Sequence, residues 1–158
     1  MPFETIDADI AHCVQYLGNF QNRDLQIQNF LTRYLIIQIS GEYEKEIKKT
    51  VSKRISSSND SELISFIDET IDRIRNFKMG DLKGILNKFD TRRGELFESW
   101  VTPEHATLYS NIIENRNFSA HGQPTQMTLD ELIESHKKAK TVIKQFQHAL
   151  YHRLSNQR

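Results

Sequence analysis

The sequence predicts an all-α fold, which we expect to be an antiparallel bundle of about five to six helices with no sheet. Apolar residues recur with a period near 3.6 along almost the whole chain, and no segment alternates apolar and polar residues as a half-buried strand would. The 6 glycines and 3 prolines are sparse and mark only a few helix ends. Because the 158 residues contain no repeat, linker or low-complexity segment, we expect one helical domain over residues 1–158.

The composition is typical of a folded globular protein, with 37% hydrophobic and 27% charged residues. The formal net charge of zero disfavours a protein that coats nucleic acid indiscriminately, although it allows a local basic patch. The single cysteine, Cys13, rules out an internal disulfide framework and a cysteine-rich zinc site, and we expect it in the core. No signal-peptide pattern is present, and the longest apolar cluster, residues 34–39, is too short to span a bilayer. We therefore expect a cytoplasmic protein that does not contact a membrane.

The first two predicted helices span residues 4–17 and 23–56. The first carries an apolar stripe spaced by three and four residues, and the later half of the second carries apolar residues every four positions. The early half of the second helix is apolar on more than one side, at Phe30, Leu31, Tyr34, Leu35, Ile36 and Ile37. This pattern predicts burial on two faces, one against the bundle and one against a second subunit.

Two shorter helices are predicted next. Asn59 and Glu62 form a capping-box pattern that starts a third helix, which we expect to continue through about Phe77. Asp81 is expected to cap a short helix that ends near Phe89. The following segment, residues 91–101, is predicted to be irregular apart from one helical turn near its end.

The last two helices have clear start signals. Thr102 with Pro103 is a favoured helix start, and Gly122 with a proline soon after it is a favoured stop. Thr128 and Glu131 form a capping box that opens a final helix through about residue 154.

Three histidines lie on the final helix. His136 lies on the apolar stripe, which predicts a core or interface histidine whose ring nitrogens are hydrogen-bonded. His148 and His152 are four residues apart, a spacing that allows a metal site. The glutamate of a metalloprotease motif does not follow, so we expect no metal there.

The segment Arg116–Gly122, RNFSAHG, places polar side chains near the end of the penultimate helix. Helical spacing puts Arg116 on the same stripe as the apolar positions Tyr109, Ile112, Ile113 and Ala120. A guanidinium there is costly to desolvate unless it meets a carboxylate, a phosphate or a water-filled cleft. Glu42 and Glu44 on the second helix are both candidate carboxylate partners.

His121 is the last residue before the predicted stop. It lies about 7–8 Å along the axis from Arg116 and about 140° around it. The negative end of the helix dipole favours a protonated imidazole, whereas a nearby Arg116 opposes it. The residues allow two readings: an arginine–histidine pair for proton transfer and charge stabilisation, with Asn117 fixing its geometry, or an ordinary helix end.

At Arg116, Asn117 and His121 the sequence resembles the HEPN superfamily of small helical-bundle proteins. The shared pattern is an arginine, a polar residue that is often asparagine, three variable residues and a histidine, at the end of the penultimate long helix. The stretch Gly41–Lys49, GEYEKEIKK, is similar to HEPN relatives that include those described beside ribosomal L-PSP-type domains.

The resemblance implies a metal-independent endoribonuclease that needs no cofactor and cleaves RNA at a cleft between two subunits of a homodimer. His121 would act as general acid or base, Arg116 would stabilise the phosphoryl group, and Asn117 would shape the site. The superfamily implies a toxin or antiviral-defence setting with a cognate antitoxin as a partner. The alternative is a non-catalytic HEPN-like module for dimerisation or for binding RNA or protein.

One residue departs from a toxin subgroup of the superfamily. In that subgroup, a tyrosine two positions after the histidine is modified by a partner nucleotidyltransferase, and here that position is Gln123. Control by that route is therefore not expected. Among the basic clusters, Arg92 and Arg93 just before the motif helix are our candidates for contacts to the RNA backbone.

Overall fold

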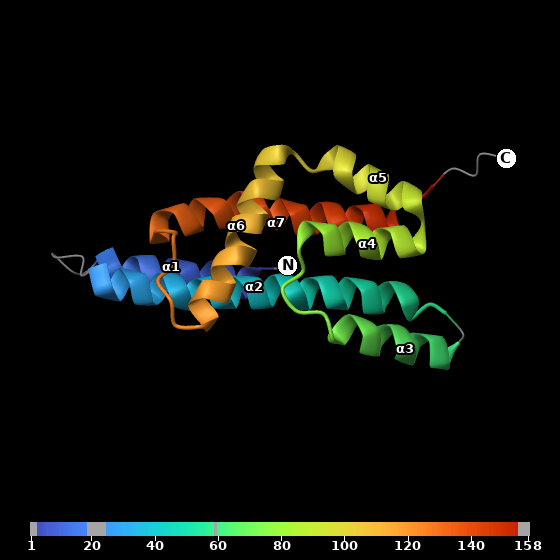
Figure 1. Cartoon of the computed structure of the whole chain (residues 1–158), viewed down its shortest axis with the longest axis horizontal. Helices are drawn as coiled ribbons and strands as arrows, with labels where there is room; N and C mark the ends of the chain where they lie inside the picture. The colour runs from blue at the N-terminus through green and yellow to red at the C-terminus, as the bar shows by residue number, and fades with distance from the viewer. Residues whose placement is uncertain (1–2, 19–24, 59, 155–158) are drawn as a thin grey trace.

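The computed structural model describes residues 3–18, 25–58 and 60–154, and these residues form seven helices and no strand (Figure 1), which confirms the all-α prediction. The expected count of five to six helices was too low, because residues 91–100 also form a helix. In chain order, the helices are α1 (Glu4–Gly18), α2 (Leu25–Ile55), α3 (Ser61–Asp72), α4 (Met79–Phe89), α5 (Thr91–Trp100), α6 (Pro103–Ala120) and α7 (Leu129–Tyr151). None of the helices in these ranges is both long enough and apolar enough to cross a bilayer.

The two longest helices, α2 and α7, lie side by side and run in the same direction. Tyr43 of α2 contacts His136 of α7, and further along both helices, about two turns on in α2 and about three turns on in α7, Thr50 contacts Gln147. The antiparallel arrangement that we expected is therefore not confirmed for this pair, because four intervening helices return the chain before α7 begins (Figure 1). The core lies where α2 and α7 meet α6, and its fully buried members include Leu35, Ile39, Ile47, Ile112, Ile143 and Phe146.

The segment that we predicted to be irregular is helix α5. Asp90 caps it by accepting a hydrogen bond from the Arg92 amide at 3.0 Å, and Phe97 packs into the core. Gly94 is buried where the Asn87 side chain of α4 lies directly over it, leaving no room for a side chain. A side chain at this position would have to displace Asn87, so glycine here lets α4 and α5 approach closely.

Helix α3 is shorter than predicted. It ends at Asp72 rather than near Phe77, and its N-terminal cap is Asp60, whose carboxylate accepts from the Leu63 amide at 2.9 Å. The Asn59 cap that we predicted lies outside the described residues. Phe77 is buried, and its carbonyl accepts a hydrogen bond from the Tyr109 hydroxyl at 2.6 Å. Tertiary contacts therefore hold residues 73–78 as a connection that crosses to α6.

Hydrogen bonds with capping side chains close the N-terminal ends of α4 and α7. Contrary to our expectation, Asp81 is not the cap of α4; the cap is Lys78, and Asp81 lies in the first turn, where its carboxylate accepts a hydrogen bond from the Lys78 amide at 2.8 Å. The predicted capping box of α7 is confirmed, since Thr128 and Glu131 bond reciprocally. Helix α7 ends at Tyr151, three residues earlier than predicted.

His136 is a satisfied core histidine, as predicted. Its ring is 1% exposed, with Nδ1 2.9 Å from the Tyr43 hydroxyl and Nε2 3.1 Å from Asp7 of α1. Lys140 donates to the same Asp7 carboxylate at 3.0 Å, so this cluster fastens α1 to α7. Cys13 of α1 is only partly buried and packs at the edge of the core.

The early half of α2 has one buried and one exposed apolar side. Leu35 and Ile36 are fully buried, whereas the opposite side leaves large apolar side chains in solvent. We call this set the α2 face; its members are Ile27 (36% exposed), Phe30 (69%), Tyr34 (43%) and Ile37 (38%).

Candidate functional site

The polar motif lies where α6 ends, and the backbone there is closed by its own hydrogen bonds. The Gln123 amide donates to the Phe118 carbonyl at 3.0 Å, and the Gly122 amide donates to the Ser119 carbonyl at 3.2 Å. Gly122 has φ +73°, the left-handed conformation that favours glycine, so the predicted stop is confirmed. His121 is the cap residue of the helix.

The side chains of Arg116 and His121 lie at the surface of this helix end. Arg116 is half-buried and His121 is exposed, and within the described residues neither forms a hydrogen bond or an ion pair through its side chain. The buried face of α6 runs through Asn115 and Ser119, and Ala120 is exposed. Our placement of Ala120 on the inward stripe was therefore wrong, and Arg116 lies at the edge of that stripe.

Asn117 is held by a chain of contacts that starts on α2. Its Oδ1 accepts a hydrogen bond from Asn76 Nδ2 at 3.0 Å, and the Asn76 amide donates to a Glu44 carboxylate oxygen at 3.3 Å. Asn76 has φ +54°, a conformation that asparagine tolerates better than most residues. The exposed amide of Asn117 therefore has a fixed partner on the α3–α4 connection.

The two acidic residues that we weighed as partners of Arg116 bind other cations. Glu44 lies 2.9 Å from Lys48 Nζ and 3.2 Å from Arg75 Nη1. Glu42 lies 3.3 Å from Lys45 Nζ. Within the described part of the chain, Arg116 thus keeps its charge uncompensated by either carboxylate.

Buried Asn115 fastens the segment that follows the motif. Its Oδ1 accepts from the Thr125 hydroxyl and from the Gln126 amide, both at 2.9 Å, and its Nδ2 donates to the Asn111 carbonyl at 2.9 Å. The loop after His121 is therefore bonded back onto α6. Sequence reasoning missed this residue, although an asparagine at a buried helical position is a signal of such bonding.

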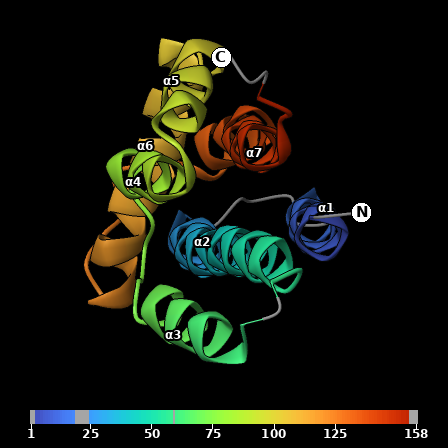
Figure 2. The same cartoon turned by 90° about the vertical axis from the view of Figure 1, so that its right-hand side faces the viewer.

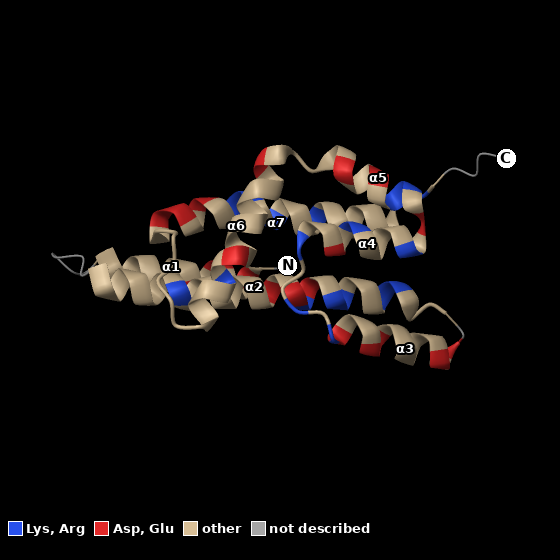
Figure 3. Cartoon of the chain, viewed as in Figure 1, with Lys and Arg blue, Asp and Glu red and all other residues tan. Residues whose placement is uncertain are grey.

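Arg33 of α2 is a third basic residue at this helix end, and sequence reasoning missed it. Its Nη2 lies 3.5 Å from the Ser119 carbonyl oxygen, and a Cβ added at Gly122 would lie 3.7 Å from it. Arg33 is the sole charged residue between Leu25 and Gly41, and Figure 3 shows this part of α2 as almost free of charge. A lone arginine in an apolar stretch was the signal available in the sequence.

Arg92 and Arg93 lie at the other end of the molecule, where α5 begins and α7 ends (Figure 1). Arg93 is 9% exposed, and its Nη1 donates to the carbonyls of Ala149, Leu150 and His152 at 2.7–3.0 Å. Arg92 pairs with Asp90 at 2.7 Å, and its hydrogen bonds hold the pKa of that carboxyl at about 2. Neither arginine therefore lies beside Arg116 within one chain. Arg93 instead binds the main-chain carbonyls at the end of α7.

His148 and His152 pack around an indole ring. The ring of His148 stacks on Trp100 with centroids 4.8 Å apart, and His152 meets the same ring edge-on at 5.4 Å. The described residues include no group of three or more His, Cys, Asp or Glu side chains placed to hold a metal ion.

The end of α6 combines two guanidinium groups with an exposed imidazole. An arginine without a carboxylate partner can bind an anion such as a phosphate, and an imidazole is suited to proton transfer near neutral pH. The fixed amide of Asn117 adds a hydrogen-bonding group beside them. Groups of these kinds are the ones that binding an anion and transferring a proton require.

A protein-family model described as RiboL-PSP-HEPN matches residues 3–152, which include all seven helices described above. Among curated proteins and among solved structures, no significant match was found.

Proposed function

The chain belongs to the RiboL-PSP-HEPN family of the HEPN superfamily, and on that premise we propose that it is a metal-independent endoribonuclease built around Arg116, Asn117 and His121. HEPN domains are often ribonucleases, which gives the coarse class. The observation that carries the finer proposal is the gathering of Arg116, Arg33 and His121 at one helix end, with no carboxylate paired to any of them within the described residues.

We place this site at the interface of a homodimer. The α2 face leaves four large apolar side chains exposed, and Phe118 beside the motif is 38% exposed. Contiguous exposed apolar side chains of this size are typical of protein–protein interfaces. Because Arg33 links α2 to the end of α6, pairing through the α2 face would bring the two motifs toward a shared cleft.

The proposed reaction is transesterification within RNA. The ribose 2′-oxygen attacks the adjacent phosphorus, the bond from phosphorus to the 5′-oxygen breaks, and the products carry a 2′,3′-cyclic phosphate and a 5′-hydroxyl. His121 accepts the 2′-hydroxyl proton or donates a proton to the leaving oxygen, and the histidine of the second subunit can perform the complementary transfer. Arg116 and Arg33 stabilise the charge on the phosphoryl oxygens.

The test is cleavage of single-stranded RNA in EDTA by wild type, Arg116→Ala and His121→Ala, with product ends mapped. Arg73→Ala and His12→Ala are matched controls, since both side chains are exposed; Arg73 is the C-terminal cap of α3 and His12 lies on α1. We expect cyclic phosphate ends from wild type and both controls, and loss of cleavage in the two motif variants. Folded wild type that binds RNA or protein without cutting would establish the non-catalytic module instead.

The dimer is tested by replacing one exposed side chain on the α2 face. Phe30→Glu is expected to give a monomer in analytical ultracentrifugation and to abolish cleavage together with the dimer. Phe66→Glu on α3 is the matched control, since Phe66 is 68% exposed and Phe30 is 69% exposed. A wild type that stays monomeric at micromolar concentration while cutting RNA would contradict the shared cleft.

For biological setting, we propose a toxin or antiviral-defence role with a cognate antitoxin. Gln123 replaces the tyrosine that a nucleotidyltransferase would modify, so control of activity would need another route. Expression of wild type is expected to arrest growth of a host cell, whereas the His121→Ala variant, expressed to the same level, is expected to be harmless. Equal growth in both cultures would argue against the toxin role.

A further inference from the structure

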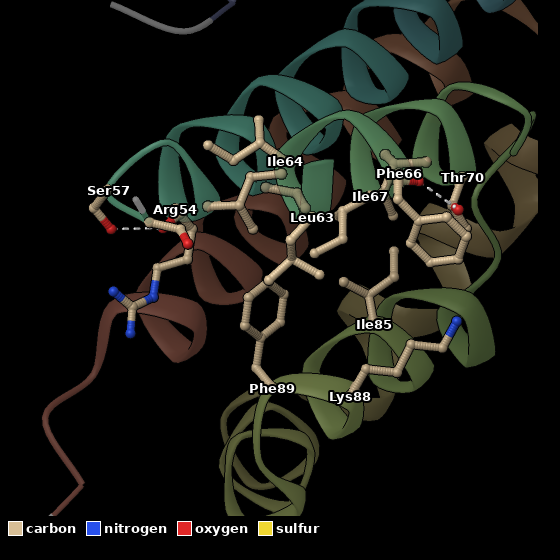
Figure 4. Close-up of a pocket in the computed structure, with 14 residues that line it drawn as sticks. Arg54, Ser57, Leu63, Ile64, Phe66, Ile67, Thr70, Ile85, Lys88 and Phe89 are labelled. Atoms are coloured by element: carbon tan, nitrogen blue, oxygen red, sulfur yellow. Dashed lines mark hydrogen bonds between the residues drawn. The ribbon is translucent and has the colours of Figure 1, made fainter. Parts of the chain in front are cut away.

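An apolar groove opens between α3 and α4, over the end of α2 (Figure 4). Its volume is about 530 Å³, within the range of ligand-binding clefts. In Figure 4 Leu63 and Ile67 of α3 face Ile85 and Phe89 of α4 across it. Figure 2 shows α3 on the side of α2 away from α7, and the groove lies between α3 and α4.

Basic and hydroxyl side chains supply all the polar lining of this groove. The lining has two cations, Arg54 and Lys88, and includes no aspartate or glutamate. Within the described residues neither cation has a carboxylate partner. Lys88 is exposed, whereas the half-buried Arg54 has its guanidinium 5.9 Å from the centroid of the Tyr151 ring and a buried Nε without a hydrogen-bond partner. The groove therefore presents uncompensated positive charge beside an apolar surface.

Three of the four acidic residues of α3 have partners outside the groove, and the fourth, Glu62, does not line it. Asp68 accepts a hydrogen bond from the Ser52 hydroxyl at 2.6 Å, and Asp72 lies 3.6 Å from Lys48 Nζ. Glu69 lies 4.0 Å from Arg73, the C-terminal cap of its own helix. The groove side of α3 is thus left with apolar side chains, and its charge comes from α2 and α4.

The upper lip of the groove carries large apolar side chains in solvent. Phe66 is 68% exposed and Leu63 is 46% exposed, and both line the groove. A small ligand within the groove would leave much of Phe66 uncovered, whereas a helix laid along it would cover both side chains. The α3 positions from Leu63 to Ile71 span about 12 Å, or roughly two turns.

We propose that this groove docks an acidic amphipathic α-helix of a partner protein. Apolar residues of that helix at i, i+3, i+4 and i+7 would pack between α3 and α4, with Phe66 as the aromatic anchor. Its flanking glutamates or aspartates would approach Arg54 and Lys88, which supply the charge complementarity. The proposal does not depend on RNA cleavage, because none of its residues belongs to the motif at the end of α6.

A displayed library of 18-residue amphipathic peptides tests the proposal. Their apolar positions are fixed at helical spacing, and their flanking positions vary among Glu, Gln and Lys. Selection on the wild-type chain is expected to enrich Glu-rich peptides. Binding of a purified enriched peptide, measured by fluorescence anisotropy, is expected to weaken at least tenfold in Phe66→Ala and in Lys88→Glu.

Two matched variants control for the other exposed surfaces. Phe30→Ala removes an equally exposed phenylalanine from the α2 face, and Lys144→Glu reverses an exposed lysine on α7. Neither is expected to change the affinity. Circular dichroism melts establish that every variant is folded, which we expect because each replaced side chain is largely exposed.

Several outcomes would overturn the proposal. One is a selection that enriches Lys-rich peptides or no peptides at all. Another is a set of peptides whose affinity falls in Phe30→Ala but not in Phe66→Ala. Dodecanoate offers a separate check on a small amphiphile. If it perturbs the NMR signals of the groove residues while selected peptides perturb signals elsewhere, the groove holds a small molecule rather than a helix.

Discussion

The ends of α7 and α6 each have an arginine from a distant helix beside them, but the two arginines are used differently. At the end of α7, Arg93 donates three hydrogen bonds to main-chain carbonyls and is buried. At the end of α6, the carbonyls are bonded by the amides of Gly122 and Gln123, and Arg33 makes one long contact of 3.5 Å. Where amides just after a helix bond its last carbonyls, a nearby guanidinium is not needed there and remains available for a ligand.

The histidines of the two regions differ in the same way. His136 on α7 is buried with a partner on each ring nitrogen, whereas His121 at the end of α6 is exposed and has no side-chain partner in the described residues. Satisfied polar groups stabilise a fold, and unsatisfied ones at a surface are candidates for chemistry. The comparison predicts that changes near α7 affect stability and that changes at the end of α6 affect activity.

Arg116→Ala should give the largest effect, and only on activity. We expect cleavage to fall by at least about 100-fold, because the charge on the phosphoryl group loses its stabilising cation. The free energy of unfolding should change by less than about 0.5 kcal/mol, because the side chain has no partner to lose. Initial rates and urea denaturation measure the two quantities. A variant that is destabilised but still cleaves RNA would show that Arg116 has a structural role rather than a catalytic one.

Arg93→Met should give the opposite result. The loss of three hydrogen bonds from a buried guanidinium leaves main-chain carbonyls unpaired, so we expect the free energy of unfolding to drop by about 2–4 kcal/mol. Cleavage per folded molecule should stay near that of wild type. Arg92→Met is the matched control and should denature like wild type, because the exposed pair with Asp90 contributes little. If folded Arg93→Met lost cleavage, the result would support a role for Arg93 in binding the RNA substrate.

Arg33→Ala should have a smaller effect on substrate binding. We expect KM to rise by about five- to tenfold with kcat less affected, and the salt dependence of RNA binding to lose about one ion. Arg73→Ala removes the same charge from an exposed position just after α3 and should leave both quantities unchanged. Identical salt slopes for the two variants would mean that Arg33 only supports the end of α6.

The smallest effects concern how stability depends on pH, first through the buried His136. Burial lowers the pKa of the His136 imidazole below its ordinary value and outweighs the opposing effect of Asp7. As the pH falls through about 6.5, the unfolded chain therefore binds a proton more readily than the folded chain, and stability decreases. Melting temperatures from pH 7.5 to 5.5 should fall in wild type and fall less steeply in His136→Gln. Equal slopes would show that another group is responsible.

The Asp7 carboxyl should act at lower pH in the same direction. Burial raises its pKa, but the hydrogen bonds from Lys140 and His136 outweigh burial and leave the pKa below its ordinary value. Its contribution to stability is therefore present above the unfolded-state pKa and is lost as the pH falls through the folded-state pKa. An Asp7→Asn variant should lose this part of the acid sensitivity.

The sequence predicted the features that depend on neighbours within about four residues. These include the start of α6 at Thr102, its stop at Gly122 and the capping box of α7. The same periodicity identified His136 as a core residue. Local prediction failed at α5, because this helix is held by the packing of Gly94 against α4 and of Phe97 in the core, which neighbours along the chain do not specify.

The sequence by itself determined the all-α class, the family resemblance and the motif residues Arg116, Asn117 and His121. Only the tertiary structure decided that α2 and α7 run in parallel, that Asn76 holds Asn117 and that Arg33 lies beside Ser119. The latter two contacts join residues 41 and 86 positions apart. Capping and periodicity are set by hydrogen bonds within one or two turns, whereas such long-range contacts depend on how whole helices pack.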